Sequence, residues 1–202
     1  MTDVRNNVAV GFAPWIVFWV ISAPSTWKWA SLAALIVALG IALPGFVPDR
    51  AGRRAGISAL DGASLAFFAV VSVLALVLQR NTLAVLELYA QTLSMALLAV
   101  VAIVGAVVGR PFTAFYARQG VPEQYWGTPE FLRVNRVISL VWGAAFVVIA
   151  VAGFVAVRYA VALDLLQWVV PVVALVAAAR FTQAYTADDR TDRTGPTPER
   201  AA

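Results

Sequence analysis

The chain has 202 residues, of which 61% are hydrophobic and 13% are charged, and its formal net charge is +4. This composition lies outside the usual range of soluble domains and predicts a polytopic membrane protein with no separate soluble domain. The absence of Cys and His excludes disulfides, thiolate or imidazole metal sites and histidine proton shuttles. We expect no cofactor, and we expect no nucleic-acid partner because the basic residues flank apolar segments.

Six apolar segments can be drawn, at about 8–23, 29–47, 58–78, 84–109, 137–157 and 161–183. A spanning helix requires about 20 mainly apolar residues, so the predicted fold class is all-α, a transmembrane bundle of six helices in a domain 1–185. A disordered polar cytoplasmic tail is expected over 186–202. Twelve of the 15 Lys and Arg residues, Arg180 among them, flank the segments on one side. The positive-inside rule then places both termini in the cytoplasm.

The first segment, 8–23, is short and contains Pro14 near its start. One alternative is a signal peptide with Arg5 as its charged region, but the bulky Trp15 and Trp19 do not suit a cleaved leader. A re-entrant or interfacial segment is a further alternative and would leave five full spans.

Segments three and four are joined by about five residues and are expected to form an antiparallel hairpin. Segment four contains Gly105 and Gly109, a small-xxx-small spacing that lets two helices approach closely in lipid. This spacing suggests a dimer seam and hence a homo-oligomer. Ordinary packing within the bundle is the favoured interpretation, because Gly and Ala are abundant throughout the chain.

Ionisable residues inside a membrane commonly mark transport or proton pathways. A carboxylate occurs at the edge of each of three segments. In segments four and six, further polar residues follow this carboxylate at helical spacing, so that they form a polar stripe. The residues of this candidate cavity are Glu87, Gln91, Ser94, Asp164 and Gln167. One hypothesis is a polar cavity that opens outward between segments four and six. Hydrogen bonding between helices that fixes their packing is the favoured alternative.

The cytoplasmic loop after segment four is too aromatic for a simple linker. Phe112, Phe115 and Tyr116 recur at i, i+3 and i+4 between two arginines, which predicts a short helix lying in the headgroup layer. Thr128 is a good N-cap with Pro129 at the first helical position, so a helix is expected to start at about 129. The residues predicted to contact a partner or lipid are Arg110, Phe112, Phe115, Tyr116, Arg118, Trp126, Asn135 and Arg136.

Asp188, Asp189 and Asp192 form a DDxxD pattern, which in prenyl-transferring enzymes coordinates magnesium on a diphosphate. The pattern stands once in this chain, within the polar tail, and no second acidic motif accompanies it. We therefore interpret it as part of a charged tail and predict no metal site.

The exit from segment four and the re-entry of segment five carry a motif. The residues concerned are Gly109, Arg110, Pro111, Phe112, Trp126, Asn135, Trp142 and Phe146. With the short aromatic first segment and the hairpin, this arrangement resembles the intracellular septation protein A family of small bacterial inner-membrane proteins. The resemblance covers about residues 8–160, and the chain departs from it in the longer aromatic loop 112–127 and in the tail.

That resemblance implies a multi-pass protein of the bacterial cytoplasmic membrane with a role in envelope maintenance or cell division, and it supplies no catalytic residues. It favours a non-enzymatic protein that contacts lipids and envelope or division proteins through its loop 110–136. A small transporter or channel that uses Glu87 and Asp164 is the first alternative, and a lipid-modifying membrane enzyme is the second.

Overall fold

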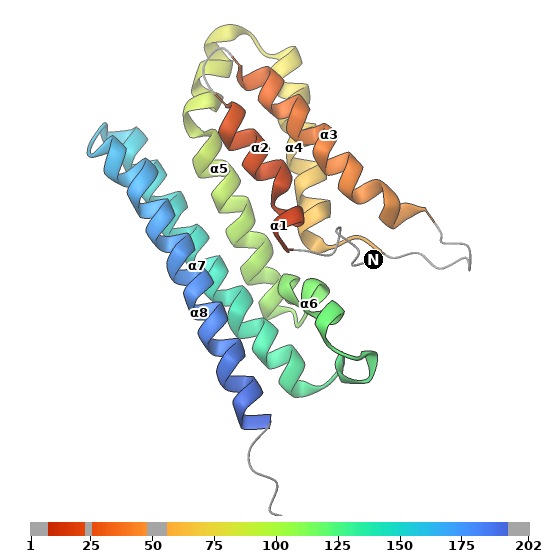
Figure 1. The fold of residues 1–202 in the computed structure, drawn as a ribbon. Helices are drawn as coiled ribbons and strands as arrows, with labels where there is room; N and C mark the ends of the chain where they lie inside the picture. Colours follow the sequence, from red (N-terminus) through yellow and green to blue (C-terminus); the bar gives the residue numbers. More distant parts are fainter. Residues whose placement is uncertain (1–7, 23–25, 48–55, 194–202) are drawn as a thin grey trace, which may run out of the picture.

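The computed structural model describes residues 8–22, 26–47 and 56–193, and every regular element within them is helical (Figure 1). In chain order the elements are α1 (Val8–Gly11), α2 (Ala13–Ile21), α3 (Trp27–Phe46), α4 (Ala59–Val77), α5 (Arg80–Val107), α6 (Phe112–Ala117), the 3-10 turns η2 (Arg118–Gly120) and η3 (Glu123–Tyr125), α7 (Pro129–Tyr159), the π-helical turn η4 (Leu165–Val169) and α8 (Val170–Arg193).

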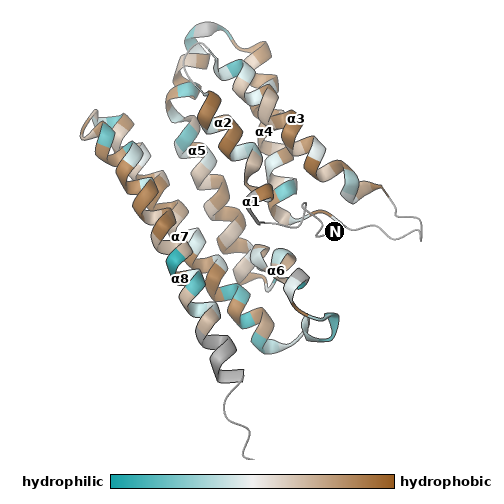
Figure 2. Cartoon of the chain, in the orientation of Figure 1, coloured by the Kyte–Doolittle hydropathy of each residue, from teal (hydrophilic) through white to brown (hydrophobic). Residues whose placement is uncertain are grey.

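In the described part of the chain, five helices are long and apolar enough to cross a membrane. They are α3, α4, α5, α7 and the continuous helix formed by η4 and α8. Figure 2 shows hydrophobic residues predominating along them. The predicted all-α class is thus confirmed, and the five helices are those expected of a multi-pass membrane protein.

The first predicted segment is broken into two short helices, and α2 has only 9 residues. Even so, it connects α6 with the start of α3. Gly11 lies against the Tyr116 hydroxyl of α6, while the Phe18 ring lies 6.3 Å from that of Trp27 at the start of α3. We call the end of the bundle that holds α6 the α6 end; α1 begins and α8 finishes there (Figure 1). The six-span count and the location of the termini stay predictions.

Helix α2 places aromatic side chains in the protein core. Trp15 is 0% exposed, and its ring centroid lies 5.1 Å from that of Phe67 and 4.9 Å from that of Phe68 in α4. Its indole N–H donates to the Ser64 hydroxyl at 2.8 Å. Aromatic side chains bury large apolar areas, and a buried indole usually finds a hydrogen-bond acceptor. This bond therefore fixes how α2 sits against α4.

Helices α5 and α7 pack closely because α7 has glycines at the contact. A Cβ atom at Gly143 would lie 2.6 Å from Cγ1 of Ile103, and one at Gly153 would lie 2.8 Å from the Thr92 hydroxyl oxygen. Small residues at such contacts let helix backbones approach closely in lipid. The pair α5 and α7 thereby joins the two halves of the bundle seen in Figure 1.

The two glycines considered for a dimer seam both take part in the C-terminal cap of α5. Gly109 has a φ of +76°, which is the left-handed conformation that favours glycine. The Arg110 N–H donates to the Gly105 carbonyl at 2.8 Å, and the Gly109 N–H donates to the Ala106 carbonyl at 3.4 Å. These two bonds form a Schellman motif. The spacing of the two glycines is thus explained within one chain.

Helix α8 packs mainly on α7 (Figure 1). It follows the π-helical turn η4, and Pro171, which has no N–H to donate, is the second residue of α8. The helix continues to Arg193 and so includes residues 186–193, which the sequence analysis assigned to the tail. Residues 194–202 lie outside the described residues.

We predict that Ser64→Ala destabilises the protein by about 1–2 kcal/mol, because it leaves the buried Trp15 N–H without an acceptor. Ser72→Ala is the matched control. Ser72 is a buried serine of the same helix whose hydroxyl has no hydrogen-bond partner among the described residues. Its replacement should be neutral or slightly stabilising. Thermal unfolding in detergent, followed by near-ultraviolet circular dichroism, measures both, and equal effects of the two changes would contradict the assignment.

Candidate functional site

Helix α6 is tied to α7 through a buried hydroxyl network. The Thr113 hydroxyl donates to the Asn135 carbonyl at 2.9 Å and lies 3.0 Å from the Ser139 hydroxyl. Since Thr113 has a single O–H, Ser139 is the donor of the second bond. The Asn135 side-chain amide donates to the Phe131 carbonyl at 2.8 Å. These polar groups are therefore satisfied inside the protein.

The other side of α6 is tied to α1 and α4 through Tyr116. Its hydroxyl lies 3.2 Å from the hydroxyl of Ser58, which caps α4 in a reciprocal pair of bonds with Asp61. A Cβ atom at Gly11 would collide with the Tyr116 hydroxyl oxygen, so a larger residue there requires the Tyr116 side chain to shift. Burial raises the pKa of Tyr116 to about 12, and the hydroxyl therefore stays protonated at neutral pH.

The loop that follows α6 is folded on itself. The Trp126 indole N–H donates to the Val121 carbonyl at 2.8 Å, and the Arg118 guanidinium lies 5.3 Å from the centroid of the Trp126 ring. The Thr128 hydroxyl accepts from the Phe131 N–H at 3.3 Å and caps α7. This cap and Pro129 at the first position of α7 agree with the predicted start of the helix.

Four arginines stand exposed around this loop and on the first turns of α7. They are Arg110, Arg118, Arg133 and Arg136, and none forms an ion pair with another described residue. The described carboxylates on the same part of the chain are the exposed Glu123 and Glu130. The loop and the base of α7 thus present unpaired positive charge on a folded support, which we call the arginine surface.

The structure divides the predicted contact residues into two groups. Phe112, Tyr116 and Asn135 are 4%, 7% and 3% exposed, so they belong to the protein interior and not to a contact surface. The sequence analysis placed them in contact with lipid or a partner, because an amphipathic spacing does not tell whether its apolar face meets lipid or protein. Phe115 and Trp126 are half-buried, whereas Arg110, Arg118 and Arg136 are exposed.

The predicted cavity residues have separate environments. Ser94 is fully buried, where its hydroxyl donates to the Gln91 carbonyl at 2.8 Å and accepts from the Trp19 indole at 3.4 Å. Glu87, Gln91 and Gln167 are half-buried, and Asp164 is exposed. The bonds of Ser94 join α2 to α5, which corresponds to the packing alternative for this residue.

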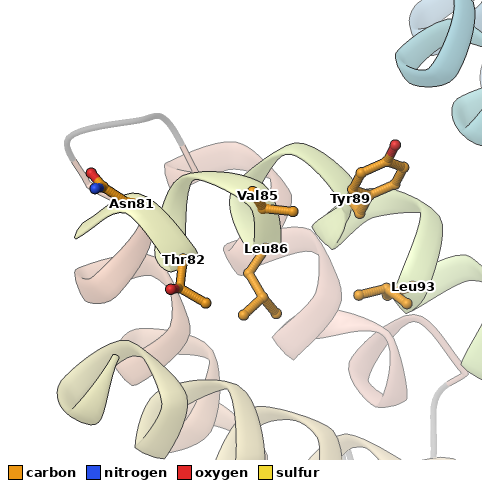
Figure 3. Close-up of a pocket in the computed structure, with 6 residues that line it drawn as sticks. All are labelled: Asn81, Thr82, Val85, Leu86, Tyr89 and Leu93. Carbon is orange, nitrogen blue, oxygen red and sulfur yellow. The ribbon is translucent and has the colours of Figure 1, made fainter. Parts of the chain in front are cut away.

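A groove that the sequence did not reveal lies along the first half of α5 (Figure 3). Its volume is about 560 Å³, and its lining consists of Asn81, Thr82, Val85, Leu86, Tyr89 and Leu93. None of the predicted cavity residues is among them. Thr82, Leu86, Tyr89 and Leu93 follow helical spacing, but this pattern is equally typical of a lipid-facing surface.

Among the described residues, no group of three or more acidic side chains is close enough to hold a metal ion. The side chains of Asp188, Asp189 and Asp192 lie outside those that the structure describes. Comparisons with protein-family models, curated proteins and solved structures found no match to this chain. The resemblance to intracellular septation protein A therefore stays a prediction.

We predict that Gly11→Ala destabilises the protein by about 1–3 kcal/mol, because the new methyl group collides with the Tyr116 hydroxyl. In the Tyr116→Phe background the nearest ring atom is Cζ, at 3.0 Å, so the same change should cost less. A double-mutant cycle of unfolding free energies in detergent should give a coupling of about 1 kcal/mol. Gly40→Ala is the control, since a Cβ there meets nothing within 4 Å. Strict additivity would show that α1 does not hold α6.

Proposed function

We propose that this chain is a non-enzymatic protein of the bacterial inner membrane that supports the cell envelope or the division machinery. In this proposal the arginine surface docks an acidic partner at the cytoplasmic face. The observation that carries it is the clamping of α6 between Tyr116 with Ser58 on one side and Thr113 with Ser139 on the other. A clamped α6 holds the start of the loop and the base of α7 in a preformed arrangement, which lowers the entropy lost on binding.

The charge distribution supports this choice. Arg110, Arg118, Arg133 and Arg136 are exposed without ion pairs to described residues, so they are free to meet acidic groups. Arginine suits such contacts because its planar fork binds carboxylates through two bonds at once. The resemblance to the septation protein family, which we propose as well, points to a function of the same kind.

The transporter alternative receives less support from the geometry. A substrate path would require polar groups that converge at depth, but Asp164 is exposed and the hydroxyl of Ser94 is occupied by Trp19. The groove on α5 is largely apolar and does not include Glu87. For these reasons we rank a contact function first.

The double substitution Arg133→Gln and Arg136→Gln tests the proposal on two exposed residues that the fold does not require. At about 1 kcal/mol for each arginine that meets an acidic surface, the affinity for the partner should fall by at least about tenfold. The measurement is complementation of a strain that lacks the gene, scored by cell length and by sensitivity to detergent. Complementation should be lost while the amount of protein in the membrane stays normal.

Glu87→Gln is the matched control, since the transporter alternative makes that carboxylate essential and the contact function does not. Full complementation by the arginine variant together with failure of Glu87→Gln would reverse our ranking. A fluorescent protein fused to the C-terminus checks that removing two positive charges has not inverted the helices.

Topology gives a separate prediction. If the α6 end faces the cytoplasm, a fluorescent protein fused after Ala202 fluoresces, and alkaline phosphatase inserted after Gln79, at the turn between α4 and α5, is active. Absence of fluorescence after Ala202 together with an inactive phosphatase after Gln79 would place the arginine surface on the outer face and would remove the basis of the proposed function.

A further inference from the structure

Arg180 projects from α8 on the side that faces away from α7. On that helix Ala178 is 2% exposed, and the Thr182 hydroxyl accepts from the Trp142 indole of α7 at 3.1 Å. Arg180 lies two residues from each of them, which is a rotation of about 200° around the helix axis. It is exposed and makes no ion pair with any described residue. The guanidinium is therefore directed at whatever surrounds the bundle.

The depth of Arg180 follows from the register of α7 and α8. The bond between Trp142 and Thr182 places these two residues at one level. Arg136 lies six residues from Trp142 toward the α6 end, and Arg180 lies two residues from Thr182 away from it. With the rise of an α-helix, Arg180 stands about 12 Å further inside than Arg136.

Helix α5 relates Arg110 to the same level of the bundle. Gly143, next to Trp142 in α7, lies against Ile103 of α5. Ile103 precedes Val107, the last residue of α5, by four residues or about 6 Å along the axis, and Arg110 follows in the turn beyond it. Arg180 also lies within the stretch Leu165–Ala187 that is apolar enough to span a membrane. Arg133 and Arg136 also lie within a candidate span, Pro129–Tyr159, so it is the register, about 12 Å from Arg136, that puts the start of the Arg180 side chain deeper in a membrane-embedded bundle.

A guanidinium at this depth is costly unless its side chain extends toward the headgroups and meets a compensating anion. We propose that Arg180, with Gln183 one turn nearer the α6 end, binds the phosphate of an anionic glycerophospholipid in the leaflet at that end. The acyl chains of this lipid lie on Val173 and Val176. Gln183 shares the exposed face of Arg180 and supplies amide donors beside the guanidinium.

The order of side chains on this face fits a phospholipid. Val173 and Val176 are 61% and 53% exposed and lie deeper than Arg180, while Gln183 lies nearer the headgroups. The sequence of apolar, cationic and polar groups along the helix matches acyl chain, phosphate and glycerol headgroup. Since α8 packs mainly on α7, this face has no protein cover within the described chain.

A carboxylate from a second copy of the chain is the competing anion. The described carboxylates are Asp61, Glu87, Glu123, Glu130 and Asp164. Asp61 is engaged in the cap of α4, and Glu123 and Glu130 lie beyond the end of α5 and at the start of α7. Glu87 and Asp164 belong to the opposite end of the bundle. No described carboxylate therefore lies at the depth of Arg180, and a phospholipid is the better occupant.

The test is native mass spectrometry of the full chain in detergent, titrated with palmitoyl-oleoyl phosphatidylglycerol. Arg180→Gln should weaken the tightest binding step by about fivefold to tenfold, which corresponds to the loss of one arginine contact to an anionic headgroup. Arg180→Lys should lose less, because it keeps the charge without the planar fork. Since residue 180 faces lipid, near-ultraviolet circular dichroism should show an unchanged fold.

Arg158→Gln is the control, because Arg158 is an exposed arginine at the opposite end of the bundle. An equal effect of the two glutamine variants would show general attraction of anionic lipid and would overturn the proposal. So would unchanged binding in Arg180→Gln, or a loss of dimer mass without a change in lipid binding, which would identify a second copy as the occupant. The arginine surface is intact in all of these variants, so the outcome does not depend on the proposed function.

Discussion

The hydrogen bond between the Trp15 indole and the Ser64 hydroxyl is the contact on which the arrangement of the bundle depends. A polar group surrounded by apolar side chains costs several kcal/mol unless it is paired, and the hydrocarbon layer offers no water to pair it. Helix α2 is too short to be positioned by its own length, so its depth and rotation are set by where this donor finds an acceptor. The rings of Phe67 and Phe68 then pack around an indole that is already fixed.

Contacts at the start of α2 extend this constraint to both halves of the molecule. Phe12, which precedes α2, stacks on Trp142 of α7 at a centroid distance of 6.0 Å, and Trp142 in turn donates to Thr182 of α8. Gly11 makes room for the Tyr116 hydroxyl and so sets the position of α6. The short segment from Gly11 through α2 thereby links the core at α4, the hairpin of α7 and α8, and the support of the arginine surface.

The features that follow from local chemistry could be predicted from the sequence. Helix lengths follow from apolar runs, and the start of α7 follows from Thr128 and Pro129, because a cap and a proline act within one turn. The helix at α6 was also predicted, yet its burial was not. Phe112 and Tyr116 have an apolar spacing that fits lipid and protein equally well, and only the partners Ser58 and Gly11, which are distant in sequence, decide between them. The groove on α5 is of the same kind, since its lining is also a regular helix face.

Arg180 shows that charge counting predicts the side of the membrane but not the depth of a residue. By its position near the end of an apolar segment it belongs with the arginines that orient the chain, and the sequence analysis counted it among them. The pairing of Trp142 with Thr182 shows that Arg180 lies about 12 Å farther from the α6 end than Arg136. Helix α8 is the least apolar and the least buried of the five candidate spanning helices. The charge of Arg180 therefore lies on the helix whose apolar side chains favour the hydrocarbon layer least. A charge in that position is stable only where α8 is held by α7 on one side and the guanidinium meets an anion on the other, which couples the packing of this hairpin to the lipid around it.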